Sequence, residues 1–217
     1  LQQALDYLDL LMPLDVITLS GNGEPTLALN LDEIIACAKE YFDKPVVVLT
    51  NGFLLSNRAV RADLKFADQV VVKLDAISDQ QLHNVNRPVT DIGIMSIIEG
   101  IIQFSEEYSG ELAIRTMLLA PWPSEFQARY IELIQEIIPD EVQLNVPYRP
   151  RMLTRQLEAR GNQVKTLASH EFQKLSCVDT KILQDFATQI ETYAGISTSY
   201  PMFKTQNPSS REFYVKN

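Results

Sequence analysis

Cysteine is scarce in this chain of 217 residues, which contains only Cys37 and Cys177, 140 positions apart. Two distant thiols cannot form a disulfide framework, and they cannot hold a zinc ion or an iron–sulfur cluster. We therefore expect a reduced protein of the cytoplasm. Long apolar runs are also missing, since none approaches the roughly 18 residues that a membrane helix needs. We accordingly expect no membrane partner.

Positive charge is the other shortage. The chain has 19 basic and 28 acidic residues, a net charge of −9, which argues against non-specific binding of nucleic acid. The charge is unevenly distributed: residues 1–148 hold 9 basic and 22 acidic residues, whereas residues 149–217 hold 10 and 6. We predict a main body over residues 1–148 and a basic helical extension over residues 149–217.

The chain begins at Leu1 rather than at a methionine, and leucines recur from there at helical spacing. We expect a fragment whose upstream segment is missing.

Five β-branched runs alternate with helical patterns along the chain. Their nearly continuous apolar character is typical of parallel strands that are buried on both faces. The sequence predicts an α/β fold with right-handed crossovers, either an open sheet or a barrel. The predicted strands cover residues 15–20, 45–50, 69–74, 112–118 and 141–146. The predicted helices cover residues 32–42, 57–66, 93–108, 125–138 and 171–193. The cap-x-x-Glu/Gln spacing also predicts helix starts at Asn30, Ser78 and Ser124, and Ser56 can cap a further helix.

Ligands of parallel α/β folds bind where the strands end, so the residues that follow each strand are the candidates for a site. Residues 21–26 (GNGEPT) follow the first strand, and their glycines allow a backbone to approach a ligand. Glu24 could bind an ammonium group there, or the segment is a plain tight turn. Asn51 and Gly52 follow the second strand, where an ordinary strand–helix turn is the alternative.

Later strands also end in polar residues. Lys73 and Asp75 share one face of the third strand, where two charges are costly unless they pair with each other or bind a ligand. The remaining polar candidates are Arg115 and Met117 in the fourth strand, Gln143 and Asn145 in the fifth, and a basic run of Arg149, Arg151, Arg155 and Arg160. This run is either a solvated surface or a site for an anionic partner.

Five motifs in order carry a family resemblance. They are SGNGEPTL at 20–27, VVVLTNGFLL at 46–55, VVVKLDA at 70–76, NRP at 86–88 and VQLNVPYRP at 142–150. Over residues 10–150 the chain resembles radical SAM proteins, most closely the Fe–S oxidoreductase subgroup related to wyosine tRNA-modification enzymes. The resemblance implies a partial (β/α)6 TIM-like barrel of parallel strands with its first strand missing. It also implies S-adenosylmethionine and a 4Fe-4S cluster as cofactors.

The resemblance also implies a set of cofactor contacts. The family's Gly-Gly-Glu, which holds the methionyl ammonium, corresponds to Asn-Gly-Glu here, and Lys73 stands where many members carry serine. The residues that it places at the cofactor are Asn22, Gly23, Glu24, Thr50, Asn51, Gly52, Lys73, Asp75 and Asn145.

The family's CxxxCxxC motif is absent from this sequence, so no metal ligand and no catalytic residue is assigned. We expect a fragment of an oxidoreductase that would bind S-adenosylmethionine. With its missing iron–sulfur segment it would generate a 5′-deoxyadenosyl radical, which would act on an unknown substrate. Flavodoxin or ferredoxin would donate the electron, and the basic run suits a phosphorylated or RNA substrate.

Two other functions stay open at this point. One is a Schiff-base lyase on a barrel, with Lys73 as the nucleophile and Asp75 as its proton partner. The other is a non-catalytic remnant that binds a ligand or partner at the same strand ends.

Reconstitution with iron and sulfide tests the missing cysteine motif. We expect the 217-residue chain to take up no 4Fe-4S cluster under anaerobic conditions, because three clustered thiolates are lacking. Visible absorbance and iron analysis measure this. A stable cluster of about four irons per chain would contradict the assignment of the ligands to another segment.

Overall fold

A computed structural model describes residues 14–20, 23–88, 92–147 and 178–202 with their side chains, and residues 151–152, 172–173 and 213–216 as backbone. The helical pattern of residues 1–11 and the loop residues Gly21 and Asn22 lie outside the described residues. So do Cys177 and most of the basic run after residue 148.

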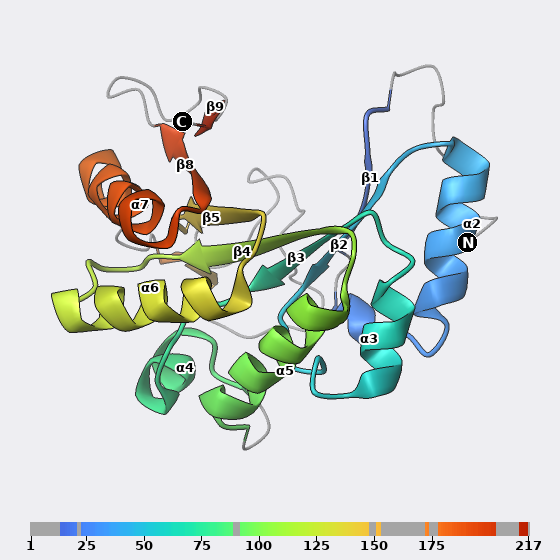
Figure 1. Ribbon diagram of the computed structural model, residues 1–217, viewed down its shortest axis with the longest axis horizontal. Helices are drawn as coiled ribbons and strands as arrows, with labels where there is room; N and C mark the ends of the chain where they lie inside the picture. Colours follow the sequence, from blue (N-terminus) through green and yellow to red (C-terminus); the bar gives the residue numbers. More distant parts are fainter. Residues whose placement is uncertain are drawn as a thin grey trace. The chain divides into compact units, whose positions relative to one another are not determined.

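The strands form a mainly parallel sheet. They are β1 (Ile17–Leu19), β2 (Val46–Thr50), β3 (Gln69–Lys73), β4 (Glu111–Met117), β5 (Glu141–Asn145), β6 (Arg151–Met152), β7 (Phe172–Gln173), β8 (Ser197–Met202) and β9 (Phe213–Lys216). Seven of them are hydrogen-bonded in the order β1-β2-β3-β4-β5-β8-β9 (Figure 1). The first six in this order run parallel, β9 is antiparallel to β8, and β6 pairs with β7. The predicted α/β fold of parallel strands is confirmed, as an open sheet.

Helices connect the strands as the sequence predicts. They are α2 (Leu31–Phe42), α3 (Arg58–Leu64), α4 (Asp79–Val85), α5 (Ile94–Glu107), α6 (Ser124–Ile137) and α7 (Thr180–Ala194), with a 3₁₀ turn η1 (Pro25–Leu27). The prediction of a helix over residues 171–193 is wrong at its start. Residues 172–173 are a strand, and α7 begins only after Asp179, whose side chain accepts a hydrogen bond from Ile182 N.

Side-chain caps account for the starts of α3, α4 and α7. The predicted cap of α4 is confirmed, because the Ser78 hydroxyl accepts from Gln81 N at 3.3 Å. Asn57 rather than Ser56 caps α3, through a hydrogen bond from Ala59 N. The cap expected at Asn30 is wrong, since its side chain makes no capping hydrogen bond. Every helix that the structure describes is too short or too polar to cross a lipid bilayer.

The chain divides into two compact units. The first unit comprises residues 1–74, 88–114 and 136–140, and the second comprises residues 75–87, 115–135 and 141–217. Residues after 148 thus supply β8, which pairs with β5. The division of the chain at about residue 148 stays a prediction.

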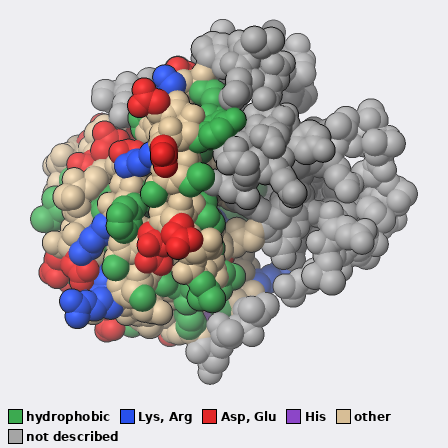
Figure 2. All heavy atoms as spheres, turned by 90° about the vertical axis from the view of Figure 1, so that its right-hand side faces the viewer, with side chains coloured by type: hydrophobic (Ala, Val, Ile, Leu, Met, Phe, Trp, Pro, Cys, Tyr) green, Lys and Arg blue, Asp and Glu red, His purple; other side chains and the backbone are tan. Residues whose placement is uncertain are grey.

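In the first unit, β1 pairs in parallel with β2, and β2 with β3. Val48, Val70 and Val72 are fully buried on the face that α3 and α5 cover (Figure 1). On the molecular surface around α2, acidic and basic side chains are interspersed (Figure 2), and Lys39 of this helix pairs with Asp68 at 2.8 Å. This mixture of charges is typical of a solvated surface.

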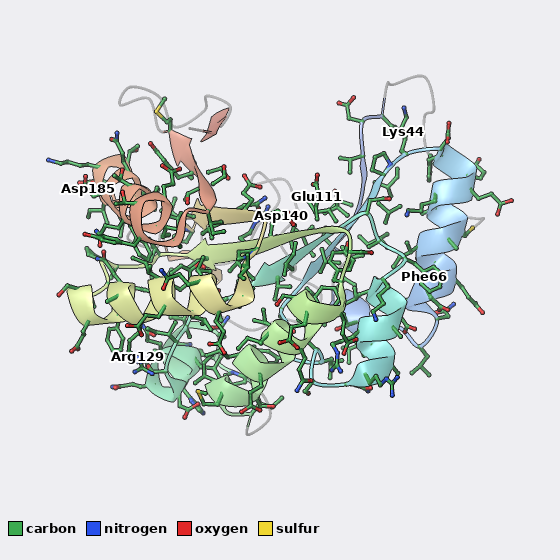
Figure 3. All side chains as sticks on the ribbon, in the orientation of Figure 1. Lys44, Phe66, Glu111, Arg129, Asp140 and Asp185 are labelled. Carbon is green, nitrogen blue, oxygen red and sulfur yellow. The ribbon has the colours of Figure 1, made fainter. Side chains whose placement is uncertain are left out.

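Two aspartates in equivalent places hold the starts of strands in the first unit. Asp68, just before β3, accepts from Val46 N at 2.7 Å. Asp140, which is labelled in Figure 3, lies just before β5 and accepts from Leu112 N at 2.8 Å. Burial raises the pKa of the Asp68 carboxyl, but the hydrogen bonds from Lys39 and Val46 N outweigh it and hold this pKa below its ordinary value.

In the second unit, α6 and α7 bury one face of β5 and β8. Trp122, Tyr130 and Phe186 form an aromatic cluster with ring centroids 5.5–6.0 Å apart. The Tyr130 hydroxyl lies 2.7 Å from Thr116 Oγ1 in β4. Burial raises the pKa of Tyr130 well above its ordinary value, so this phenol stays neutral.

Gly100 tests the packing of α5 in the first unit. A Cβ atom there would lie 2.6 Å from Ser56 N and 2.8 Å from the carbonyl carbon of Leu55, and neither backbone atom can move freely. We expect Gly100→Ala to lower the free energy of unfolding by about 1–2 kcal/mol, although alanine favours helices. Urea unfolding measures this, with the exposed Ser96→Ala on the same helix as the control. Equal or greater stability of Gly100→Ala would contradict the close approach.

Candidate functional site

Glu24 lies in the loop after β1, at the position that caps η1. Its Oε1 accepts hydrogen bonds from Thr26 N at 3.3 Å and from the Thr26 hydroxyl at 2.8 Å. Pro25 occupies the first position of the turn, where a missing N–H costs nothing. The local sequence Glu-Pro-Thr therefore places the carboxylate in a fixed orientation at the end of the first strand.

The same carboxylate binds the loop that follows β2. Glu24 Oε1 accepts from the Thr50 hydroxyl at 2.5 Å, and Oε2 accepts from Asn51 N at 2.9 Å. One half-buried side chain thus joins two loops that are about 26 residues apart in the sequence. A carboxylate has about four acceptor positions, so Oε2, with one donor from the described residues, has room for another.

Thr50, Asn51 and Gly52 form a tight turn whose side chains serve the backbone. Asn51 Oδ1 accepts from Phe53 N at 3.0 Å, and Gly52 N donates to Thr50 Oγ1 at 3.1 Å. Gly52 has a φ of +78°, and a Cβ atom there would lie 3.0 Å from Val72 Cγ1. Glycine is therefore required at this turn by conformation and by packing. These contacts make the turn a support for Glu24.

A cavity of about 320 Å³ lies next to Glu24 in the first unit. A volume of this size is at the lower end of small-molecule sites. Its lining is mostly apolar and includes Thr18, Leu19, Ser20, Glu24, Leu31 and Ile34. Gly23 also lines it, and a Cβ atom on Gly23 would meet nothing within 4 Å. The cavity thus combines an apolar wall with one carboxylate.

Lys73 and Asp75 belong to different units. Lys73 is the last residue of β3 in the first unit and is half-buried. Asp75 is 3% exposed, and its carboxylate accepts from Met117 N at 2.8 Å and from Asn86 Nδ2 at 3.3 Å, both in the second unit. Asn86 belongs to the NRP motif, so the structure gives this motif a role that the sequence analysis did not assign.

Asn145 ends β5 in the second unit. Its Oδ1 accepts from Val146 N at 2.8 Å, and its carbonyl oxygen accepts from Leu118 N at 2.8 Å. The structure therefore brings Glu24, Thr50, Asn51 and Gly52 together in the first unit, and it places Asp75 and Asn145 in the second. Asn22 lies outside the described residues.

The second unit also contains a hydrogen-bonded row that joins two of the polar strand candidates, Arg115 and Gln143, to Glu141, which the sequence analysis did not name. Arg115 donates to Gln143 Oε1 through Nε at 2.9 Å and through Nη2 at 2.6 Å, and Gln143 Nε2 donates to Glu141 Oε2 at 2.9 Å. The sequence signal for this row is that polar residues alternate with apolar ones in the two predicted strands. The signal does not show which polar residues contact each other, because that depends on the register of the strands.

The described residues do not fit an iron–sulfur cluster. In the ranges described with side chains, no three His, Cys, Asp or Glu residues lie close enough together to hold a metal ion. Cys37 is a single thiol on α2, and Cys177 is outside those ranges.

Comparison with known proteins identifies the family. No protein-family model matches the chain. A UPF0026 protein of Synechocystis sp. is 46% identical over 183 residues, which are 84% of this chain and 69% of that protein. The chain belongs to the UPF0026 family. A UPF0026 protein of Methanocaldococcus jannaschii is 34% identical over 139 residues, which cover 63% of this chain but only 43% of that protein.

Two further similarities concern the superfamily and the fold. A probable GTP 3′,8-cyclase of Saccharolobus islandicus is 36% identical over 86 residues, which are 39% of this chain and 26% of that protein. A domain of a pyruvate-formate lyase-activating enzyme from Bacteroides vulgatus has the same fold, with a TM-score of 0.58 and 16% identity over 86% of this chain and 98% of that domain. Together with the UPF0026 relatives they point to the radical SAM superfamily.

Thr50 tests the link between the two loops. We expect Thr50→Val to lower the free energy of unfolding by about 1–3 kcal/mol, because Glu24 loses a buried donor and Gly52 N loses its acceptor. Urea unfolding measures the loss. Thr188→Val on the exposed side of α7 is the matched control, and we expect it to change stability by less than about 0.5 kcal/mol. Equal stability of the two variants would show that the Glu24 link contributes little.

Proposed function

We propose that this chain is the part of a radical SAM enzyme that binds S-adenosylmethionine, in the subgroup related to wyosine tRNA-modification enzymes. The observation that carries the proposal is the Glu24 carboxylate, which is held by Thr50 and Asn51 beside a cavity of about 320 Å³. Membership of the UPF0026 family and the fold of the activating-enzyme domain support it.

The chemistry of Glu24 suits the methionyl ammonium of this cofactor. Within the described residues, Oε2 accepts one hydrogen bond, from Asn51 N. A primary ammonium has three N–H groups, and one of them can donate to the remaining acceptor position of Oε2. A charge-assisted hydrogen bond to a half-buried carboxylate is stronger than a neutral one. Because Thr26 and Thr50 hold Oε1, the carboxylate does not have to be ordered when the ligand binds.

The apolar wall of the cavity suits the remainder of a methionyl group. Leu19, Leu31 and Ile34 line it, and apolar contact favours the methylene groups beside a sulfonium. Gly23 leaves space on the loop side, since nothing lies within 4 Å of its absent Cβ. Glu24, Gly23 and the turn Thr50–Asn51–Gly52 are therefore the residues we assign to this end of the cofactor. Asn22, Lys73, Asp75 and Asn145 remain proposed contacts to its other parts.

In such an enzyme, one electron from a reduced 4Fe-4S cluster would cleave bound S-adenosylmethionine into methionine and a 5′-deoxyadenosyl radical. The described residues do not fit such a cluster, and the whole chain contains only two cysteines, Cys37 and Cys177, so we assign the cluster ligands to a part of the protein outside these 217 residues. The Synechocystis relative supports this assignment, because the match covers 69% of its length. Flavodoxin or ferredoxin is the proposed electron donor of the whole protein.

Binding of S-adenosylmethionine to the full-length UPF0026 protein tests the proposal. We expect Glu24→Ala to weaken binding by at least about tenfold, since a lost charge-assisted hydrogen bond costs roughly 1.5–3 kcal/mol. Isothermal titration calorimetry of the anaerobically reconstituted protein measures the affinity. Glu33→Ala, on the exposed side of α2, is the matched control and should bind as the wild type does.

Thermal melts separate loss of the contact from loss of the fold. Glu24→Ala is informative at temperatures where its melting curve shows a folded protein, and Thr50→Val serves there as a variant that is destabilised with its carboxylate intact. Wild-type affinity in folded Glu24→Ala would mean that Glu24 only supports the loops.

A further inference from the structure

The NRP motif, Asn86-Arg87-Pro88, is a feature of the sequence to which the proposed function assigns no ligand contact. Its first two residues follow α4 in the second unit. Asn86 Nδ2 donates to Asp75 Oδ2 at 3.3 Å, and Asp75 Oδ1 accepts from the N–H of Met117, the last residue of β4, at 2.8 Å. Parallel α/β sheets bind ligands at the carboxyl ends of their strands. The motif is therefore anchored at the edge of the sheet where a ligand is expected.

Asn86 is held at this place at a cost in free energy. Its Nδ2 rather than its amide oxygen faces the Asp75 carboxylate, because two acceptors would repel each other. The amide oxygen, Oδ1, is buried and accepts no hydrogen bond within the part of the chain that the structure describes. A buried acceptor without a donor is rare in folded proteins. The anchoring of the motif at Asp75 therefore outweighs the loss of one hydrogen bond.

Arg87 has an unfavourable backbone conformation. Its φ is +49°, in the left-handed region, and its N–H donates to the carbonyl oxygen of Leu82 at 3.1 Å, which closes the end of α4. Glycine is the usual residue at such a helix end, because it has no Cβ atom. Residues that break local rules of this kind concentrate at functional sites. The presence of an arginine here is therefore better explained by its side chain than by the helix end.

The guanidinium of Arg87 is available to a ligand. The side chain is exposed, and within the ranges described with side chains it forms no ion pair and no hydrogen bond. Arg61 in the first unit shows the contrast, because it is buried and pairs with Glu107 at 3.0 Å. It also donates to the carbonyl oxygens of Leu55 and Ser56. Arg87 thus keeps the five N–H groups of a guanidinium for a partner from outside the described residues.

The charge of the second unit favours an anion. Its residues include 13 basic and 11 acidic side chains, a net charge of +2, whereas the first unit has 6 and 17, a net charge of −11. The phosphate backbone of a nucleic acid would need several cations, but residues 79–88 contain one arginine and no lysine. A single planar guanidinium instead matches one phosphate group, with two parallel hydrogen bonds.

We propose that Arg87 binds the phosphate group of a small phosphorylated molecule. The inference goes beyond the proposed function, because it names a ligand other than S-adenosylmethionine. It rests on the proposed function in one respect only: in a radical SAM enzyme, this phosphorylated molecule would be the substrate on which the radical acts.

Equilibrium dialysis of the full-length protein with radiolabelled inorganic phosphate tests the proposal. The variants are Arg87→Gln, Arg87→Lys and Arg87→Gly. Arg129→Gln, on the exposed side of α6 (Figure 3), is the matched control for loss of one positive charge in the same unit. Melting curves show whether each variant is folded, and a titration with S-adenosylmethionine measures the proposed function in the same samples.

We expect Arg87→Gln to weaken phosphate binding at least about tenfold, because charge-assisted hydrogen bonds are lost. Arg87→Lys should retain part of the affinity, since lysine keeps the charge but not the planar fork. Arg87→Gly should lose phosphate as Arg87→Gln does and yet melt no lower than the wild type, because glycine relieves the left-handed backbone. Arg129→Gln should bind phosphate as the wild type does, and all the variants should keep their affinity for S-adenosylmethionine.

Wild-type phosphate affinity in folded Arg87→Gln or Arg87→Gly would overturn the proposal, as would a wild type that binds no phosphate. An equal loss in Arg129→Gln would also overturn it, because binding would then depend on general charge. So would a lower melting temperature of Arg87→Gly, which would make Arg87 a residue of the helix end.

Competition with a short single-stranded RNA tests the size of the ligand. Displacement of phosphate by this RNA with a steep salt dependence would contradict a small molecule as the occupant. The proposed function fails separately, if the wild type does not bind S-adenosylmethionine. In that case the phosphate measurements still decide whether Arg87 is a phosphate site.

Discussion

The loops at the end of β1 and β2 depend on a single half-buried carboxylate. Glu24 receives hydrogen bonds from Thr26 in its own turn and from Thr50 and Asn51 in the next loop, so removing it would leave several buried donors without an acceptor. Burial of a charge is tolerated here because backbone and hydroxyl donors replace water around it. The same arrangement fixes the direction in which the remaining acceptor position of Oε2 points, and that is what the proposed ligand contact needs.

The second unit also contains charged side chains that are removed from water, and two of them are stabilised in different ways. Asp75 is buried and receives hydrogen bonds from Met117 N and from Asn86, so its charge supports the backbone. Arg115 is held by a neutral amide and keeps N–H groups that its described surroundings do not use. The difference between a satisfied and a partly satisfied charge separates residues that maintain a fold from residues that suit a ligand.

Much of the fold is predictable from local sequence. The five β-branched runs correspond to β1 to β5 with boundaries that differ by at most two residues, because continuous apolar runs have few alternatives to a buried parallel strand. Ser78 caps its helix as expected, since its partner Gln81 lies in the same turn. The errors concern helix starts for which a second capping residue was available along the chain. Asn57 rather than Ser56 caps α3, and the helix that was expected from residue 171 begins only after Asp179.

The sequence by itself determined the alternation of strands and helices, the family resemblance and the choice of Glu24 as a candidate, because these depend on residue type and spacing along the chain. Only the tertiary structure decided what the candidate residues contact. Thr50 meets Glu24 across about 26 positions, and Arg115 meets Gln143 across 28, and such contacts depend on strand order and register. A shift of one residue in a strand would turn each side chain to the opposite face. The local pattern shows that a position is polar, whereas the packed sheet decides which polar neighbour it meets and which donors remain for a ligand.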